Sequence, residues 1–268
     1  MKNLREKFTN KFPRFTAFVI KAHLNYLFMA LLLYGFKAAL YFLIAKIPND
    51  RIATFDMAID TQIPFIKYFY VFYLSYYFVP EIFIWILSFF DKRKVTALVL
   101  GGVAANLLCC ICFLIYQVKM IRPNGGIYPL YESEPVSAFA SNIHDFSSFF
   151  DFLIAFQYHA DDTALNCFPS LHAVFGTVLF LVGIPLTKRE VNLEKKMPLW
   201  LSIIAIVFGL GIVVSTFFVK QHYFIDAVAG MAIMIGMYYL ADFFIGRYLK
   251  KKALNNENVA EEKLEVQE

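Results

Sequence analysis

Six long apolar segments, separated by gaps that hold most of the charge, constrain this chain more than any other feature of its sequence. A helix that crosses the hydrocarbon core of a bilayer needs about 20 predominantly apolar residues. The segments that reach or approach this length are residues 25–45, 68–90, 95–118, 168–186, 199–219 and 223–245. With 59% hydrophobic and only 17% charged residues, the chain also departs from the composition of soluble domains. We therefore predict an all-α fold, a polytopic membrane protein built as a six-transmembrane-helix bundle.

The distribution of lysine and arginine predicts how this bundle is oriented, because cytoplasmic loops of membrane proteins carry an excess of these residues. With six spans, the basic gaps all fall on one side, at residues 1–24, 91–94, 188–196 and 247–252. The opposite side holds the gap 47–65 and the long loop 119–167, both richer in acids. We predict a multi-pass protein of the cell membrane with both termini cytoplasmic.

The same pattern divides the chain into three regions. Residues 1–24 are basic with interspersed phenylalanines, which is typical of an amphipathic surface helix or, equally, of a basic topogenic tail. Residues 25–246 form the membrane domain, and residues 247–268 form a charged cytoplasmic tail that we predict to be disordered. Within the outer loop, residues 146–156 are apolar but too few to span, so we expect a re-entrant or interfacial helix.

Two charges lie inside the predicted spans. Lys37 and Glu81 fall at similar depths of the first and second spans. An unpaired charge is costly there, so we predict that the two side chains pair. Pro80 is expected to kink the second span beside them.

Polar residues that can carry chemistry gather at the outer ends of three spans. Ser170 and His172 fall in the first turn of the fourth span, where free N–H groups and the helix dipole favour an anion. His222 and Asp226 open the sixth span and, four residues apart, share one helix face. A carboxylate in this position can hold an imidazole in one tautomer and stabilise its cation.

Positive charge is available at the same membrane face. Lys119 and Arg122 end the third span, where they can neutralise a phosphate group. One histidine at a membrane interface is unremarkable alone, but here several groups converge, and Asp226 lies inside an apolar run. The outer-loop residues His144, His159, Asp161 and Asp162 fit no metal-ligand spacing, so we predict no metal and no cofactor.

The two histidine segments together resemble a known family. Phe168-Pro-Ser-Leu-His172, followed by Ser215-x6-His222-x3-Asp226, is similar to the type 2 phosphatidic acid phosphatase superfamily over roughly residues 119–230. Leu171, Thr216 and Ile115 stand where that family carries glycine, arginine and lysine. These departures make the chain more similar to the inositol phosphorylceramide synthase-like branch. We hypothesise that Lys119 and Lys220 supply the missing charge.

The resemblance implies a mechanism. His222 would be the nucleophile that forms a phosphohistidine, Asp226 would brace it, and His172 would protonate the leaving alkoxide and then activate the acceptor. The residues implied to bind the phosphate oxygens are Lys119, Arg122, Ser170 and Lys220.

Three functions remain open from the sequence. The first is a phosphatase of lipid phosphates or diphosphates at the extracytoplasmic face. The second is a phosphotransferase that passes the phospho-headgroup from a lipid to an alcohol by the same chemistry. The third is a non-catalytic lipid binder or transporter. The expected partners are the lipid phosphate and the bilayer, not nucleic acid, and the sequence predicts no oligomeric state.

Overall fold

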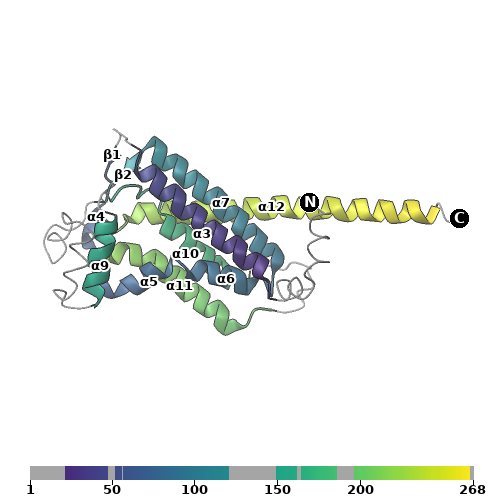
Figure 1. The fold of residues 1–268 in the computed structure, drawn as a ribbon, viewed down its shortest axis with the longest axis horizontal. Helices are drawn as coiled ribbons and strands as arrows, with labels where there is room; N and C mark the ends of the chain where they lie inside the picture. The colour runs from purple at the N-terminus through teal and green to yellow at the C-terminus, as the bar shows by residue number, and fades with distance from the viewer. Residues whose placement is uncertain are drawn as a thin grey trace, which may run out of the picture.

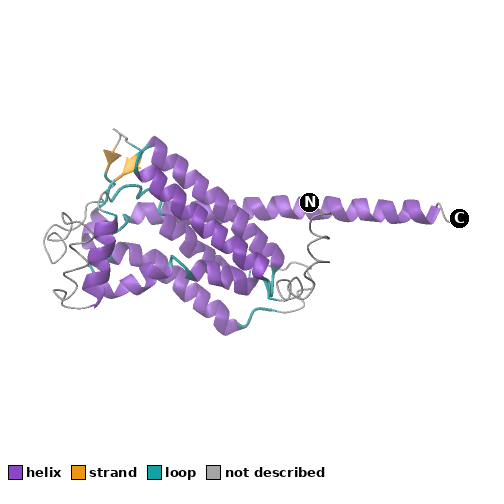
Figure 2. Ribbon diagram, in the orientation of Figure 1, coloured by secondary structure: helices purple, strands orange, loops and turns teal. Residues whose placement is uncertain are grey.

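The computed structural model describes residues 22–47, 52–55, 57–120, 149–161, 164–185 and 196–265. These residues form an elongated bundle of helices with two short strands at one end (Figures 1 and 2). The elements in chain order are α3 (Leu24–Ala45), β1 (Ile52–Ala53), α4 (Ala58–Gln62), η1 (Lys67–Phe69), α5 (Tyr70–Ser75), α6 (Val79–Leu87), α7 (Lys92–Ile115), β2 (Gln117–Val118), α9 (Phe149–Ala160), α10 (Leu171–Gly183), α11 (Leu199–Phe218) and α12 (Phe224–Glu265). The predicted all-α fold is confirmed for the described residues.

Several of these helices can cross a membrane. α3, α7, α11 and the first part of α12 are long and apolar enough, and α5 with α6 adds a fifth span if the bent pair counts as one. The predicted fourth span, residues 168–186, corresponds to α10, which has only 13 residues. The count of six and the cytoplasmic termini therefore stay predictions, and the proposed N-terminal surface helix lies mostly outside the described residues.

The short helix α10 lies in the centre of the bundle. Its sequence is apolar on all sides, which is typical of a helix surrounded by protein, and 11 of its 13 residues are buried. α10 and α11 approach most closely where two glycines meet. A Cβ atom added to Gly209 would lie 2.6 Å from the carbonyl oxygen of Gly176, so no larger residue fits there without moving a backbone. This packing holds the first turn of α10 inside the bundle.

The second predicted span is broken, as Pro80 led us to expect. α5 ends at Ser75, α6 begins at Val79, and the two helices are bent by 43°. The predicted pairing of Lys37 and Glu81 is also confirmed: Lys37 Nζ lies 2.9 Å from Glu81 Oε1, with the side chains 1% and 3% exposed. Either charge would be costly to bury without a counter-ion. For this reason the sequence alone predicted the pair.

The C-terminal segment differs from the prediction of disorder. α12 continues as a helix through Glu265 and extends well beyond the bundle in Figure 1. The residues after Ile245 are rich in lysine, leucine, alanine and glutamate, which all have high helix propensity. Local propensity extends the helix here, whereas the low hydrophobicity on which we based the prediction only argues against a packed core.

Candidate active site

The first wall of the site is the beginning of α10. Ser170 is the N-cap, and its hydroxyl accepts a hydrogen bond from the N–H of Ala173 at 3.2 Å. Its own N–H donates to the carbonyl oxygen of Asp226 at 3.0 Å, which joins α10 directly to α12. His172 follows in the first turn of the helix, as the sequence predicted.

The second wall is the turn between α11 and α12, which carries His222. The N–H groups of Gln221 and His222 both donate to the carbonyl oxygen of Thr216, and Lys220 adopts a left-handed conformation with φ 52°. Asp226 then closes the turn, because its Oδ2 accepts the N–H of Tyr223 at 2.9 Å. The backbone of the turn is therefore held on both sides of the imidazole.

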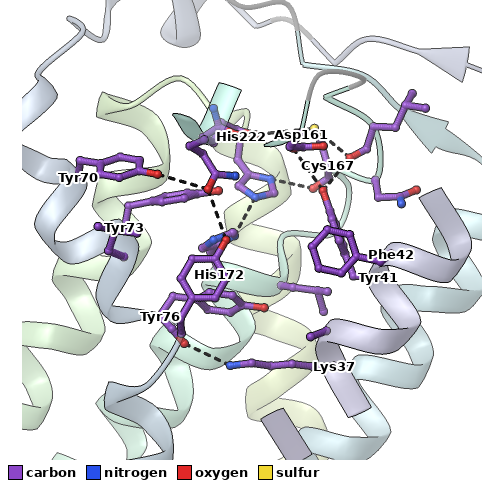
Figure 3. Close-up of a pocket in the computed structure, with 18 of the residues that line it drawn as sticks. Lys37, Tyr41, Phe42, Tyr70, Tyr73, Tyr76, Asp161, Cys167, His172 and His222 are labelled. Carbon is purple, nitrogen blue, oxygen red and sulfur yellow. Dashed lines mark hydrogen bonds between the residues drawn. The ribbon is translucent and has the colours of Figure 1, made fainter. Parts of the chain in front are cut away.

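The two histidines predicted to act together are in contact (Figure 3). His222 Nε2 lies 3.3 Å from His172 Nδ1. The other nitrogen of His222, Nδ1, lies 3.0 Å from the carbonyl oxygen of Cys167 and 3.6 Å from Asp226 Oδ2. Both neighbours of Nδ1 are acceptors, so we assign the proton of the neutral ring to Nδ1. Nε2 then holds a lone pair, as a nucleophile must.

Aromatic rings fix the orientation of His172. Its imidazole lies 4.2 Å from the ring centre of Tyr73, nearly parallel to it, and 4.0 Å from that of Tyr76. Both tyrosines are buried. His172 Nε2 has no hydrogen-bond partner among the described residues.

The histidines line a cavity of about 420 Å³. α3, α5, α9, the beginning of α10, Asp161 and the segments 165–167 and 221–222 enclose it. Its wall is mostly apolar and aromatic, with Tyr41, Phe42, Tyr70, Tyr73, Tyr76, Tyr77 and Phe156. Asn166 also lies on the wall, and neither atom of its buried amide has a hydrogen-bond partner within the described ranges. Buried polar atoms are rarely left unpaired, so these groups mark a place for a polar ligand.

The structure separates the predicted site residues into two groups. His172 and His222 lie on the cavity wall, and Asp226 lies directly behind His222. Ser170 is fully buried as a helix cap, and Lys220 Nζ donates to the carbonyl oxygens of Asp60 and Ile63 at 2.8 and 2.6 Å. The side chain of Lys119 is exposed and is not part of the wall. Arg122, His144 and Asp162 lie outside the described residues.

A potential metal-ligand group was not apparent from the sequence. Ligand atoms of Cys167, His222 and Asp226 lie within 4.8 Å of one another, the one such group in the described part of the chain. The thiol of Cys167 donates to the carbonyl oxygen of Ala164 at 3.1 Å, and His222 Nδ1 is occupied by its own hydrogen bond. A metal ligand would need a thiolate and a free nitrogen lone pair instead. These donors therefore suit the present hydrogen bonds better than a metal, and the absence of a metal stays a prediction.

Asp60 is a contributor that the sequence reasoning missed, since it appeared there only as one acid of an outer gap. Its Oδ1 accepts the N–H of Phe224, the first residue of α12, at 2.8 Å, and its Oδ2 accepts the N–H of Met57 at 3.0 Å. The carboxylate is buried. Together with the bonds from Lys220 to the carbonyls of this segment, Asp60 clamps the turn that carries His222.

We expect Asp60→Asn to lower kcat by about 10- to 100-fold with little change in KM, because an amide NH2 would replace one of the two acceptor oxygens and a small displacement of a catalytic group is costly. The kcat and KM of the variant are measured by steady-state kinetics on the phosphate ester that the wild type turns over. Asp91→Asn is the matched control. The carboxylate of Asp91 also accepts a backbone N–H at the start of a helix, that of Lys94 at 2.8 Å, and it does not line the cavity. An unchanged kcat in Asp60→Asn would contradict the positioning role.

Comparison with known proteins gives one match to a protein family. A family model described as PAP2 superfamily matches residues 134–245, a range that contains His172, His222 and Asp226. The match supports the PAP2 superfamily, whose members are typically phosphatases, and so supports an enzyme of phosphate esters. No match was found among curated proteins or among solved structures.

Proposed function

We propose that the protein is a membrane phosphatase of lipid phosphates or lipid diphosphates, acting at the extracytoplasmic face through a phosphohistidine. The observation that carries the proposal is the contact between His222 and His172 on the wall of an aromatic cavity, with Asp226 behind His222. An apolar cavity among membrane-length helices suits the lipid part of such a substrate.

The first half of the reaction forms the phosphohistidine. The Nε2 lone pair of His222 attacks phosphorus, and the bond from phosphorus to the lipid oxygen breaks in line. His172, protonated beside the incoming anion, gives its proton to the departing alkoxide. The hydrogen bonds from Nδ1 of His222 to the Cys167 carbonyl and toward Asp226 stabilise the positive charge that develops on the ring.

The second half returns the enzyme to its first state. Neutral His172 takes a proton from water, the oxygen attacks the phosphohistidine, and the P–N bond breaks to release inorganic phosphate. Of the residues predicted to bind phosphate oxygens, Lys119 and Arg122 stay proposed ligands. Ser170 orients the beginning of α10. Lys220 stabilises the turn that carries His222, because its ammonium group donates to two carbonyl oxygens.

A phosphotransferase is the second candidate, of the inositol phosphorylceramide synthase-like kind that the sequence resembles. One observation favours it: the cavity wall carries hydroxyl and amide groups beyond the histidines. The hydroxyls of Tyr70 and Tyr77 lie 3.3 and 3.5 Å from Gln157 Oε1, and that of Tyr41 lies 3.4 Å from Asp161. Such groups can bind a hydroxylated acceptor, which would attack the phosphohistidine in place of water.

Product analysis separates the two candidates. The purified protein in detergent is given a panel of radiolabelled lipid phosphates and diphosphates without added metal, with and without alcohol acceptors. We expect release of inorganic phosphate in the absence of any alcohol. Label that appears only in a new ester, and only with an alcohol present, would establish the transferase. A folded wild type that yields neither product from any lipid would contradict both functions and favour a non-catalytic lipid binder.

A further inference from the structure

We propose that Lys37 is a further substrate-binding residue, whose ammonium group binds the phosphate oxygens while Glu81 holds it in place. This inference rests on the proposed function, because it assigns a ligand of the same phosphate site. Lys37 comes from α3, outside both histidine segments.

The placement of Lys37 on the cavity wall carries the proposal. Among the described residues it is the one lysine or arginine that lines the cavity. Figure 3 shows it next to Tyr76, on the side of the cavity where His172 lies. Lys37 Nζ is 4.1 Å from the ring centre of Tyr76, and the same ring is 4.0 Å from the imidazole of His172. One aromatic ring thus contacts both the ammonium group and the catalytic imidazole.

The break between α5 and α6 holds the ammonium group at this position. Lys37 Nζ donates to the carbonyl oxygen of Tyr76 at 3.2 Å, just after the end of α5, and to Glu81 Oε1 at 2.9 Å. Glu81 lies in the first turn of α6. A cation at the end of one half-helix and an anion at the start of the next both complement the helix dipoles. The break therefore provides a fixed support for a buried charge.

A purely structural role for the Lys37–Glu81 pair explains fewer of these observations. It accounts for the two charges, but not for the location of Lys37 on the cavity wall while Glu81 is not among the wall residues. Glu81 Oε2 also lacks a hydrogen-bond partner among the described residues. A buried ion pair stabilises a fold only when its remaining lone pairs are hydrogen-bonded, so stability alone does not account for this pair.

A phosphate bound in the cavity needs a cation on the cavity wall, and no other described residue supplies one there. A phosphate in a largely apolar cavity requires nearby positive charge, because water screens it little there. Lys119 is exposed and off the wall, Lys220 is bound to two carbonyls, and Thr216 offers no charge. A lysine on a flexible four-carbon stem can turn from the Tyr76 carbonyl toward a phosphate oxygen and keep its bond to Glu81.

The test compares Lys37→Met/Glu81→Gln with the wild type. Lys37→Met alone leaves Glu81 buried without a counter-ion and destabilises the fold, so the double variant, which removes both charges together, carries the test. Binding of inorganic phosphate and of orthovanadate is measured by thermal stabilisation in detergent and by inhibition, and KM is measured for the lipid phosphate. Lys94→Met is the matched control, since Lys94 is also buried but donates to the carbonyls of Val182 and Ile184.

We expect the double variant to bind phosphate and vanadate at least about tenfold more weakly and to show a raised KM, whereas Lys94→Met retains wild-type affinity. A folded double variant with wild-type anion affinity and KM would overturn the role of Lys37 and leave the proposed function intact. A weakened KM for the lipid with unchanged binding of both inorganic anions would overturn it as well, because Lys37 would then serve the lipid part. A wild type that neither binds these anions nor turns over a lipid phosphate would instead overturn the proposed function and the inference together.

Discussion

His222→Ala is expected to abolish phosphate release from the lipid substrate, lowering kcat on the order of 10⁴-fold or more, as loss of a covalent nucleophile does in other enzymes. In the proposed mechanism, Nε2 of His222 provides the lone pair that forms the P–N bond, and in the structure this nitrogen lies beside His172. The measurement pairs the initial rate of phosphate release with trapping of the labelled enzyme. A phosphohistidine is stable in base and labile in acid, and it should appear in the wild type only.

A second histidine of the chain gives the matched control for this experiment. His23 is also partly buried and hydrogen-bonded, with Nδ1 2.9 Å from Ser88 Oγ and its ring stacked on Phe89 at 4.2 Å. It does not line the cavity. His23→Ala should keep the wild-type rate and the wild-type phosphoenzyme. A His222→Ala protein that is folded and still forms a labelled, acid-labile intermediate would contradict the assignment of the nucleophile.

The parts of the site that the sequence predicted are those with short spacing or a large energetic penalty. His222 and Asp226 are only four residues apart, so their proximity needed no knowledge of the tertiary fold, although His222 lies in the turn before α12 and not on the predicted helix face. Lys37 and Glu81 are far apart along the chain, but the cost of an unpaired charge in a membrane made their pairing the expected solution. Both were recognisable because local geometry or solvation leaves few alternatives.

The cavity wall was not predictable in the same way. Tyr73 and Tyr76 are two of many aromatic residues in an apolar segment, and no local rule distinguishes a ring that orients His172 from one that contacts lipid. Their role depends on where the second span breaks and on how α10 packs against it. Asp60 was missed for a related reason, because one of its backbone partners, Phe224, is distant in sequence and only the folded chain brings the two together.

Lys220 shows how the same limit affects a residue that the sequence did select. Its position beside His222 suggested a phosphate ligand, but neighbours along a chain do not have to point in the same direction. The left-handed backbone at residue 220 directs the side chain to the carbonyls of Asp60 and Ile63. Among the described residues, the lysine that does lie on the cavity wall is Lys37, which comes from a different helix.

His172→Asn is expected to slow turnover of a lipid phosphate by about 10²- to 10⁴-fold, the usual contribution of a general acid and base. An asparagine amide can replace the Nδ1 donor toward His222 Nε2, but it carries no proton that an alkoxide leaving group can take. The effect should depend on the leaving group. With p-nitrophenyl phosphate, whose phenolate leaves without protonation, the first step should stay fast while hydrolysis of the phosphohistidine becomes slow.

That difference has a direct kinetic signature. Rapid mixing of the variant with p-nitrophenyl phosphate should give a burst of one nitrophenolate per active site and an accumulated phosphoenzyme, whereas the lipid phosphate should give neither. The burst requires that His222 still attacks, so it also shows that the variant is folded. Equal loss of the first step for both esters would contradict the general-acid role, and the contact between the two imidazoles would then serve only to position the nucleophile. The leaving-group dependence therefore separates proton transfer by His172 from its packing between Tyr73 and Tyr76.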